Sequence, residues 1–142
     1  MSTVRHVARA SGTTGAATPP YRVDIRLGRN QITSDEPAPS GSGDAGPSPF
    51  GLLLRALVAC TAMTLRMYAA RNGWELSELG VDARYDIDDD GRATIERTIT
   101  VPAKLAPEHR QRLADVAERT PVTVALRRGT PIATMLQPFP KP

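Results

Sequence analysis

Residues 46–71 read GPSPFGLLLRALVACTAMTLRMYAAR, and they contain the longest apolar helical pattern of the chain together with its single cysteine, Cys60. Ser48 is a preferred N-cap residue and Pro49 suits the first helical position, so a helix is expected to begin there. On a helical wheel only a narrow ribbon that contains Arg55 and Arg66 is polar. We therefore expect a long central helix, apolar on most sides, around which the rest of the chain is arranged.

Length and composition indicate one domain over residues 1–142, with residues 1–20 as a loosely ordered N-terminal strand and turn. The chain is 40% hydrophobic and only 4% aromatic, so its core must consist mainly of aliphatic side chains. The formal net charge is +3, and the arginines are scattered among acidic residues. This pattern argues against binding of nucleic acid, which favours clustered basic residues with interleaved aromatic side chains.

Cysteine and histidine content excludes several classes of site. A single cysteine cannot form an internal disulfide, and His6 and His109 have no ligand partners at metal-binding spacing. We expect no metal and no other cofactor. Arg55 and Arg66 interrupt the apolar segment and no signal-peptide pattern opens the chain, so we expect neither a membrane span nor export, but a cytoplasmic protein.

The residues before the central helix have the alternation typical of strands. Thr3 to Ala10 alternates loosely, and Tyr21 to Leu27 alternates clearly. Gly28-Arg29-Asn30 then predicts a tight turn into Gln31 to Ser34, which makes a hairpin. Residues 35–47 are rich in proline and glycine without periodicity, and we interpret them as a loop.

A second hairpin is expected after the central helix, from Gly80 to Ile87 and from Ala93 to Val101. The intervening residues 86–91 read DIDDDG, which is close to a calcium-binding loop. However, Arg97 stands where such a loop requires a bidentate glutamate, and strands flank it instead of helices. A hairpin turn at Asp90-Gly91 is therefore the preferred interpretation.

The last part of the chain predicts a helix and further extended segments. Pro107 opens an amphipathic helix through Arg119, Val122 to Leu126 is expected to be extended, and Ile132 to Leu136 to form a last strand. The order is three strands, a long helix, two strands, a helix and a strand. It predicts an α+β fold with a mostly antiparallel sheet.

Several motifs stand out along the chain. They are Asp35-Glu36-Pro37, Gly46-Pro47-Ser48-Pro49, the run ACTAMTLRMYA over residues 59–69, and Pro121-Val122. Together they resemble the OsmC/Ohr family of osmotically inducible and organic hydroperoxide resistance proteins, over nearly the whole chain. The resemblance implies an OsmC-like fold in which a mostly antiparallel sheet wraps around the long central helix. It also implies an intertwined homodimer with two sites at the subunit interface.

The resemblance further implies a thiol peroxidase, in which Cys60 attacks a hydroperoxide and becomes a sulfenic acid. In the family this sulfenic acid condenses with a second cysteine to form a disulfide, and a dithiol then reduces the disulfide. Thr120 stands at the position of that second cysteine, and Phe50 or Gly51 at the position of the family's carboxylate. The family's arginine comes from the N-terminal hairpin, where the candidates are Arg22, Arg26 and Arg29. We take Cys60, Arg26, Arg29 and Thr120 as the candidate site residues.

The chemistry of the residues leaves three hypotheses open. A thiolate is the nucleophile in peroxide reduction, and Cys60 lies too far inside its helix for the macrodipole to stabilise one, so a cation is needed. Leu53, Met63 and Met67 would suit the alkyl chain of an organic hydroperoxide, with an external thiol as reductant. Alternatively, the protein is a dimer that binds an apolar small molecule without turnover, or Cys60 is only a core residue of a structural dimer.

Overall fold

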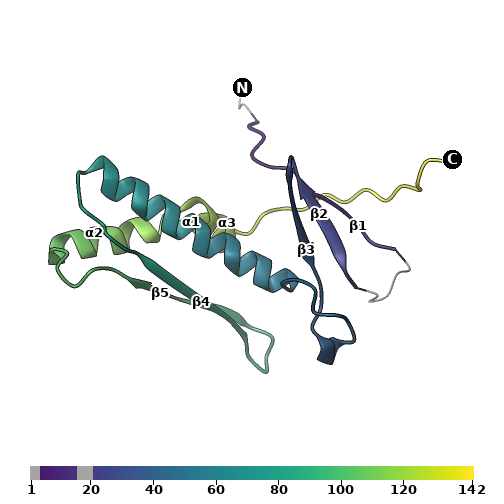
Figure 1. Cartoon of the computed structure of the whole chain (residues 1–142), viewed down its shortest axis with the longest axis horizontal. Helices are drawn as coiled ribbons and strands as arrows, with labels where there is room; N and C mark the ends of the chain where they lie inside the picture. Colours follow the sequence, from purple (N-terminus) through teal and green to yellow (C-terminus); the bar gives the residue numbers. More distant parts are fainter. Residues whose placement is uncertain (1–3, 16–20) are drawn as a thin grey trace. The chain divides into compact units, whose positions relative to one another are not determined.

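The computed structural model of the chain describes residues 4–15 and 21–142. The elements follow in the order β1 (Ser11–Thr13), β2 (Val23–Leu27), β3 (Asn30–Ser34), the 3-10 helix η1 (Ala38–Ser40), α1 (Pro49–Arg71), β4 (Gly80–Ile87), β5 (Ala93–Thr100), α2 (Pro107–Ala117) and α3 (Pro121–Arg128) (Figure 1). The chain divides into two compact units, and α1, β4 and β5 each contribute residues to both. Unit 1 comprises Met1–Ala56 and Ala83–Glu96, and unit 2 comprises Leu57–Asp82 and Arg97–Pro142.

The sheet of unit 1 is antiparallel with the order β1-β2-β3. The expected hairpin is confirmed: Ile25 pairs with Ile32 and Leu27 with Asn30, and Gly28 in the turn has a φ of 56°. This positive φ is one that glycine adopts at little cost. Together with the long helix, the sheet confirms the predicted α+β class.

The N-terminal strand differs from the expected one. Among the described residues it covers only Ser11–Thr13, whereas 4–10 have no strand structure, and Thr3 lies outside the described residues. Val4 and Val7 are 94% and 79% exposed, and among the described residues their alternating segment pairs with no strand. Pairing requires a neighbouring strand, and β2 pairs with β3 on one side and with the SGT segment of β1 on the other.

Asp35 organises the loop between β3 and α1. Its side chain is buried, and its carboxylate accepts hydrogen bonds from the backbone N–H of Glu36 (2.8 Å) and Ala45 (3.1 Å) and from the Ser42 hydroxyl. The Ser42 hydrogen bond is the main cause that lowers the pKa of Asp35 below its ordinary value of 3.8, against an opposing effect of burial. The ionised carboxylate therefore stabilises this loop.

We predict that Asp35→Asn lowers the stability at neutral pH and that this difference disappears in acid. A carboxyl whose pKa is lowered by folding contributes stability that is fully present above pH 3.8 and is lost as the pH falls through its lower folded value. The check is the urea midpoint of both proteins between neutral and strongly acidic pH. Asp44→Asn, at an exposed position of the same loop, is the control. A constant difference between wild type and Asp35→Asn at every pH would contradict the prediction.

Helix α1 begins as the sequence indicates. The Ser48 hydroxyl accepts a hydrogen bond from the N–H of Gly51 (3.1 Å), and the Ser48 carbonyl accepts one from the N–H of Leu52 (2.9 Å). These contacts satisfy groups that a helix N-terminus leaves free. The helix runs for 23 residues and ends before Gly73, which has a φ of 67°.

The hairpin of β4 and β5 is confirmed with a tight turn at its tip. The N–H of Asp88 donates to the carbonyl of Arg92 (3.0 Å), and Gly91 has a φ of 80°. One oxygen of the Asp88 carboxylate accepts hydrogen bonds from the N–H groups of Asp90 and Arg92, at 2.9 Å each. These bonds are typical of aspartate in turns.

The hydrophobic core of unit 2 lies between the second part of α1 and α2, which begins at Pro107 as expected. Its buried residues come from α1, the two connecting segments and α2. They are Leu65, Ala69, Leu76, Leu105, Leu113, Val116 and Ala117, with Tyr68, Trp74, Leu79, Ile99 and Val101 packed against them. The core is almost purely aliphatic, as the composition predicts.

Two predictions for the last part of the chain are wrong. Residues 121–128, of which 122–126 were expected to be extended, form the helix α3, and residues 132–136 are not a strand. Pro121 is at the first helical position of α3, where its fixed φ favours a helix despite the β-branched residues that follow. Ile132 and Leu136 are 88% and 98% exposed, and the alternating segment pairs with no strand in the part of the chain that the structure describes.

Candidate functional site

Cys60 lies at the border between the buried and the exposed faces of α1. The helix buries Leu57, Thr61, Leu65 and Ala69, which recur every four residues along one face. Cys60 precedes Thr61 and is rotated from it by about 100° around the helix axis. Its side chain is half-buried and its thiol is free. The residue therefore differs from a fully buried core cysteine within the chain as described.

Arg26 and Arg29 lie in unit 1, at exposed positions. Arg26 is on β2 opposite Gln31, and Arg29 is in the turn between β2 and β3. The third candidate, Arg22, forms an exposed ion pair with Asp24 at 3.3 Å. Cys60 belongs to unit 2, so the pairing of Arg26 or Arg29 with Cys60 stays a prediction.

An aromatic pair includes Phe50, one of the two positions, Phe50 and Gly51, where the resemblance would place a carboxylate. Phe50, in the first turn of α1, lies against Tyr85 of β4 with ring centroids 4.8 Å apart and the planes inclined by 37°. Both residues belong to unit 1. The pair offers an apolar surface, since Phe50 remains 53% exposed.

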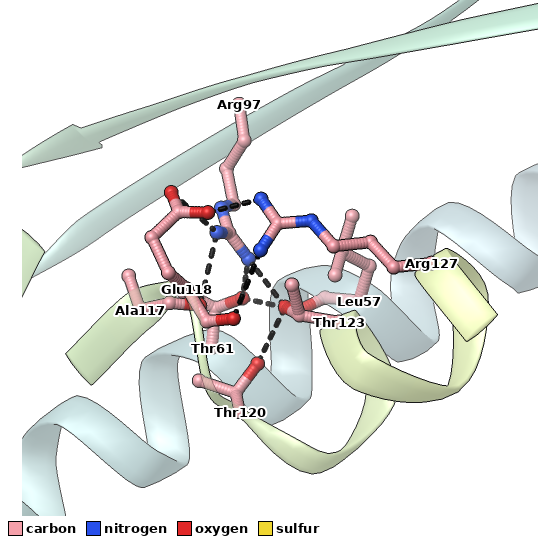
Figure 2. Close-up of polar contacts among 8 residues, drawn as sticks. All are labelled: Leu57, Thr61, Arg97, Ala117, Glu118, Thr120, Thr123 and Arg127. Atoms are coloured by element: carbon pink, nitrogen blue, oxygen red, sulfur yellow. Dashed lines mark hydrogen bonds and ion pairs between the residues drawn. The ribbon is translucent and has the colours of Figure 1, made fainter. Parts of the chain in front are cut away.

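A partly buried arginine of unit 2 contacts the turn of α1 that carries Cys60 (Figure 2). Arg97 extends from β5, and its Nη1 donates hydrogen bonds to Thr61 Oγ1 (3.0 Å) and to Thr123 Oγ1 (2.8 Å). Its Nη2 donates to the carbonyl of Ala117 at the end of α2 (3.0 Å). The side chain is only 11% exposed, and these bonds satisfy a guanidinium that would otherwise be costly to bury.

Thr120 belongs to the same polar cluster as the turn that carries Cys60. It is fully buried, and its hydroxyl oxygen lies 2.6 Å from that of Thr123, which accepts a hydrogen bond from Arg97. On the other side of the guanidinium, the Thr61 hydroxyl donates to the Leu57 carbonyl (2.7 Å). The cluster thus connects the position of the family's second cysteine with the neighbour of Cys60 (Figure 2).

The charged side chains around Arg97 include more positive than negative groups. Glu118 Oε1 lies 3.8 Å from Arg97 Nη2, and its other carboxylate oxygen pairs with Arg127 of α3. Arg127 also donates to the Glu118 carbonyl (3.0 Å). Two guanidinium groups therefore face one carboxylate, and Glu118 is itself half exposed, which weakens its share of the neutralisation.

The sequence contains one signal for this cluster, which is the position of Arg97 in its strand. Arg97 is on the inward face of β5, between the half-buried Ile95 and Ile99. A charged residue in the apolar series of an alternating strand requires a buried partner, and it could have been identified on that ground. Thr61 and Thr123 give no such signal, because threonine is common on both faces of helices and sheets.

Within residues 4–15 and 21–142, no three His, Cys, Asp or Glu side chains come together as a metal site would require.

By length and composition alone, α1 is long and apolar enough to cross a membrane, with 17% of its most apolar window buried. The central helices of globular proteins meet the same criterion.

Comparison with known proteins gives a family and a fold. The model of the OsmC family, described as OsmC-like protein, matches residues 41–135. The OsmC-like protein from Mycoplasma pneumoniae has a TM-score of 0.68 at 17% identity, over 87% of this chain and 89% of that one. The organic hydroperoxide resistance protein OhrB of Bacillus subtilis has a TM-score of 0.59 at 24% identity, over 86% and 91%. An organic hydroperoxide resistance protein from Elizabethkingia anophelis has a TM-score of 0.66 at 21% identity, over 89% and 91%.

The structural matches define an α+β protein of the OsmC-like fold, with antiparallel sheets and a long helix. The family match covers most of the chain, including all of α1 with Cys60, and the chain belongs to the OsmC family. No membrane-protein family is indicated. Comparison with curated protein sequences gives no match.

Proposed function

We propose that this protein acts in oxidative stress defence and reduces organic hydroperoxides through Cys60 with a thiol as electron donor. The observation that carries the proposal is the free, half-buried Cys60 on the central helix of an OsmC-family chain, one residue from a cluster with excess positive charge. A positive environment favours the thiolate, which is the reactive form. The two organic hydroperoxide resistance proteins of the same fold support this class of substrate.

The reaction would proceed in three balanced steps. The Cys60 thiolate attacks the distal oxygen of ROOH, the O–O bond breaks, and the alkoxide takes a proton to leave as ROH, with Cys60 as sulfenic acid. A first external thiol attacks the sulfenic sulfur and releases water, which leaves a mixed disulfide on Cys60. A second thiol attacks that disulfide and restores Cys60, with the external disulfide as the oxidised product.

The reductant must come from outside the chain in this scheme. Cys60 is the single cysteine of the sequence, and Thr120, at the position of the family's second cysteine, can form only hydrogen bonds. We assign the cation opposite the thiolate to Arg26 or Arg29 of the N-terminal hairpin, in a homodimer located in the cytoplasm. Neither nucleic acid nor a membrane surface takes part.

A second candidate function is a dimer that binds an apolar small molecule without turnover. It is favoured by the aromatic pair of Phe50 and Tyr85 at the position of the expected carboxylate. It is also favoured by Met63 and Met67, which are 63% and 52% exposed along α1. Such side chains adapt to apolar ligands of varied shape. Mass spectrometry of the native protein would detect a ligand that co-purifies.

The test of the enzymatic proposal is the consumption of cumene hydroperoxide in the presence of dithiothreitol. We expect turnover by the wild type and a fall to the uncatalysed rate for Cys60→Ser, because the hydroxyl is a far weaker nucleophile at neutral pH. Mass spectrometry of the wild type after one equivalent of peroxide should show the addition of one oxygen on Cys60. Equal rates for wild type and Cys60→Ser would overturn the proposal and leave the binding function.

A further inference from the structure

We propose that Arg97 is a positioning residue for Cys60: it fixes the helical turn that carries the thiol and directs positive charge toward it. The inference rests on the proposed function for its catalytic meaning, but the contacts that support it are independent of that function. Arg97 comes from β5, and thus from a different part of the chain than Arg26 and Arg29. It supplements those residues and replaces neither.

The first support is the way Arg97 holds the turn from Leu57 to Thr61. The Thr61 hydroxyl donates back to the Leu57 carbonyl (2.7 Å), and this places its lone pair toward Arg97 Nη1 (3.0 Å). A threonine that bonds back to its own helix adapts the local geometry of that turn. Cys60 lies inside it, so the contact that orients Thr61 also restricts the backbone of the thiol.

The second support is the burial of the Arg97 charge. At 11% exposure its side chain is screened by water much less than a surface arginine. Thr61, which it contacts, directly follows Cys60 in α1, so the guanidinium lies beside the turn that carries the thiol. Its charge therefore acts on that turn with little screening by water.

The other charged groups around Arg97 define what the cluster can do. Glu118, at the end of α2, opposes Arg97 at 3.8 Å, and Arg127 of α3 pairs with Glu118 from the other side. On α1 itself, Arg66 donates to the Leu76 carbonyl (3.1 Å) and is thereby directed toward the segment after the helix. Glu118 is therefore the negative group that limits the effect of Arg97, and its removal should act in the opposite direction to the removal of Arg97.

A purely structural role makes a different prediction from a positioning role. If Arg97 only joined β5, α1 and α3, every loss within the cluster would loosen the protein, and Cys60 would react faster or unchanged. If Arg97 positions the site and supplies positive charge to it, Arg97→Met lowers the reaction rate of the Cys60 thiol, whereas Glu118→Gln raises that rate. Opposite signs from two variants of one ion pair cannot arise from loosening alone.

The experiment measures the rate of alkylation of Cys60 by iodoacetamide in the folded full-length protein, as a function of pH. At neutral pH we expect Arg97→Met to react about fivefold more slowly than wild type and Arg97→Lys to recover part of the rate. Glu118→Gln should react about twofold faster. Glu108→Gln, in the first turn of α2, carries the same charge change at the other end of that helix and should leave the rate unchanged.

Urea denaturation of each variant shows whether it is folded. If Arg97→Met does not fold, the comparison of Glu118→Gln with Glu108→Gln still tests whether the charges of the cluster control the reactivity of Cys60. Equal rates for Glu118→Gln and Glu108→Gln, or faster alkylation of a folded Arg97→Met, would overturn the inference. Peroxide consumption is measured on the same proteins. Variant effects on alkylation without any peroxide consumption by the wild type would refute the proposed function alone. Consumption that is insensitive to Arg97 and Glu118, together with unchanged alkylation, would refute the inference alone.

Discussion

Replacement of Gly46 by alanine is expected to destabilise the protein by about 3 kcal/mol, or to prevent folding. A Cβ atom at position 46 would lie 2.1 Å from the carbonyl oxygen of Thr33 and 2.8 Å from its carbonyl carbon. These are backbone atoms of β3, so the clash cannot be relieved by a change of rotamer. The glycine of the GPSP motif thus lets the segment before α1 approach the end of β3 closely.

The hydrogen bonds next to this contact would be disturbed as well. The Pro47 carbonyl accepts from the N–H of Asp35 (3.2 Å) and from the hydroxyl of Ser34 (2.7 Å). Displacement of residue 46 would lengthen both bonds, and each contributes about 1 kcal/mol.

Gly15→Ala is the matched control, because nothing lies within 4 Å of a Cβ atom at that position. Chemical denaturation followed by circular dichroism measures both variants. We expect Gly15→Ala to remain within about 0.5 kcal/mol of wild type. A Gly46→Ala variant of wild-type stability would show that the approach of Gly46 to Thr33 is not required by the fold.

The elements that local signals define were predictable from the sequence. The start of α1 at Pro49, the turn at Gly28 and the bounds of β4 depend on capping, on positive φ and on alternation over eight residues. Each signal acts between residues close in the chain, so no knowledge of the tertiary fold is needed to apply it.

The predicted strands that the structure does not contain depend on partners elsewhere in the chain or outside it. The alternation of residues 4–10 and 132–136 is real, but a strand forms only where another strand edge is free to pair. In 121–128 the period was ambiguous, because eight residues with β-branched side chains fit a short helix and a strand equally well. Pro121 decides between the two, because proline at the first helical position favours a helix.

The candidate site could be predicted only in part, for a related reason. Cys60 is singled out by its uniqueness and by the motif around it; the structure places it half-buried on α1, and its reactivity stays a prediction. Arg97 contacts Thr61 across 36 positions of sequence, and such contacts leave no local pattern. The charged residue on an apolar strand face indicated that a partner existed, but its identity required the tertiary structure.

Leu65→Ala is expected to cost about 3–4 kcal/mol of unfolding free energy, since it removes a large side chain from a filled core. Leu65 is 0% exposed and belongs to the cluster that includes Leu113 and Val116 of α2. Met63, two residues earlier on the same helix, is 63% exposed. On the single chain, Met63→Ala should therefore cost less than about 0.5 kcal/mol.

The comparison of these two variants also tests the proposed homodimer. Within the chain as described, α1 buries only one narrow face, and the apolar side chains of Met63 and Met67 are exposed to solvent. Exposed apolar surface of this kind is typical of an interface with another protein. If a second copy covers that side, Met63→Ala weakens self-association, whereas Leu65→Ala lowers stability at any protein concentration. Sedimentation velocity and urea denaturation at about 1 and about 50 micromolar protein separate the two effects. A wild type that sediments as a monomer at both concentrations, with Met63→Ala indistinguishable from it, would contradict the homodimer.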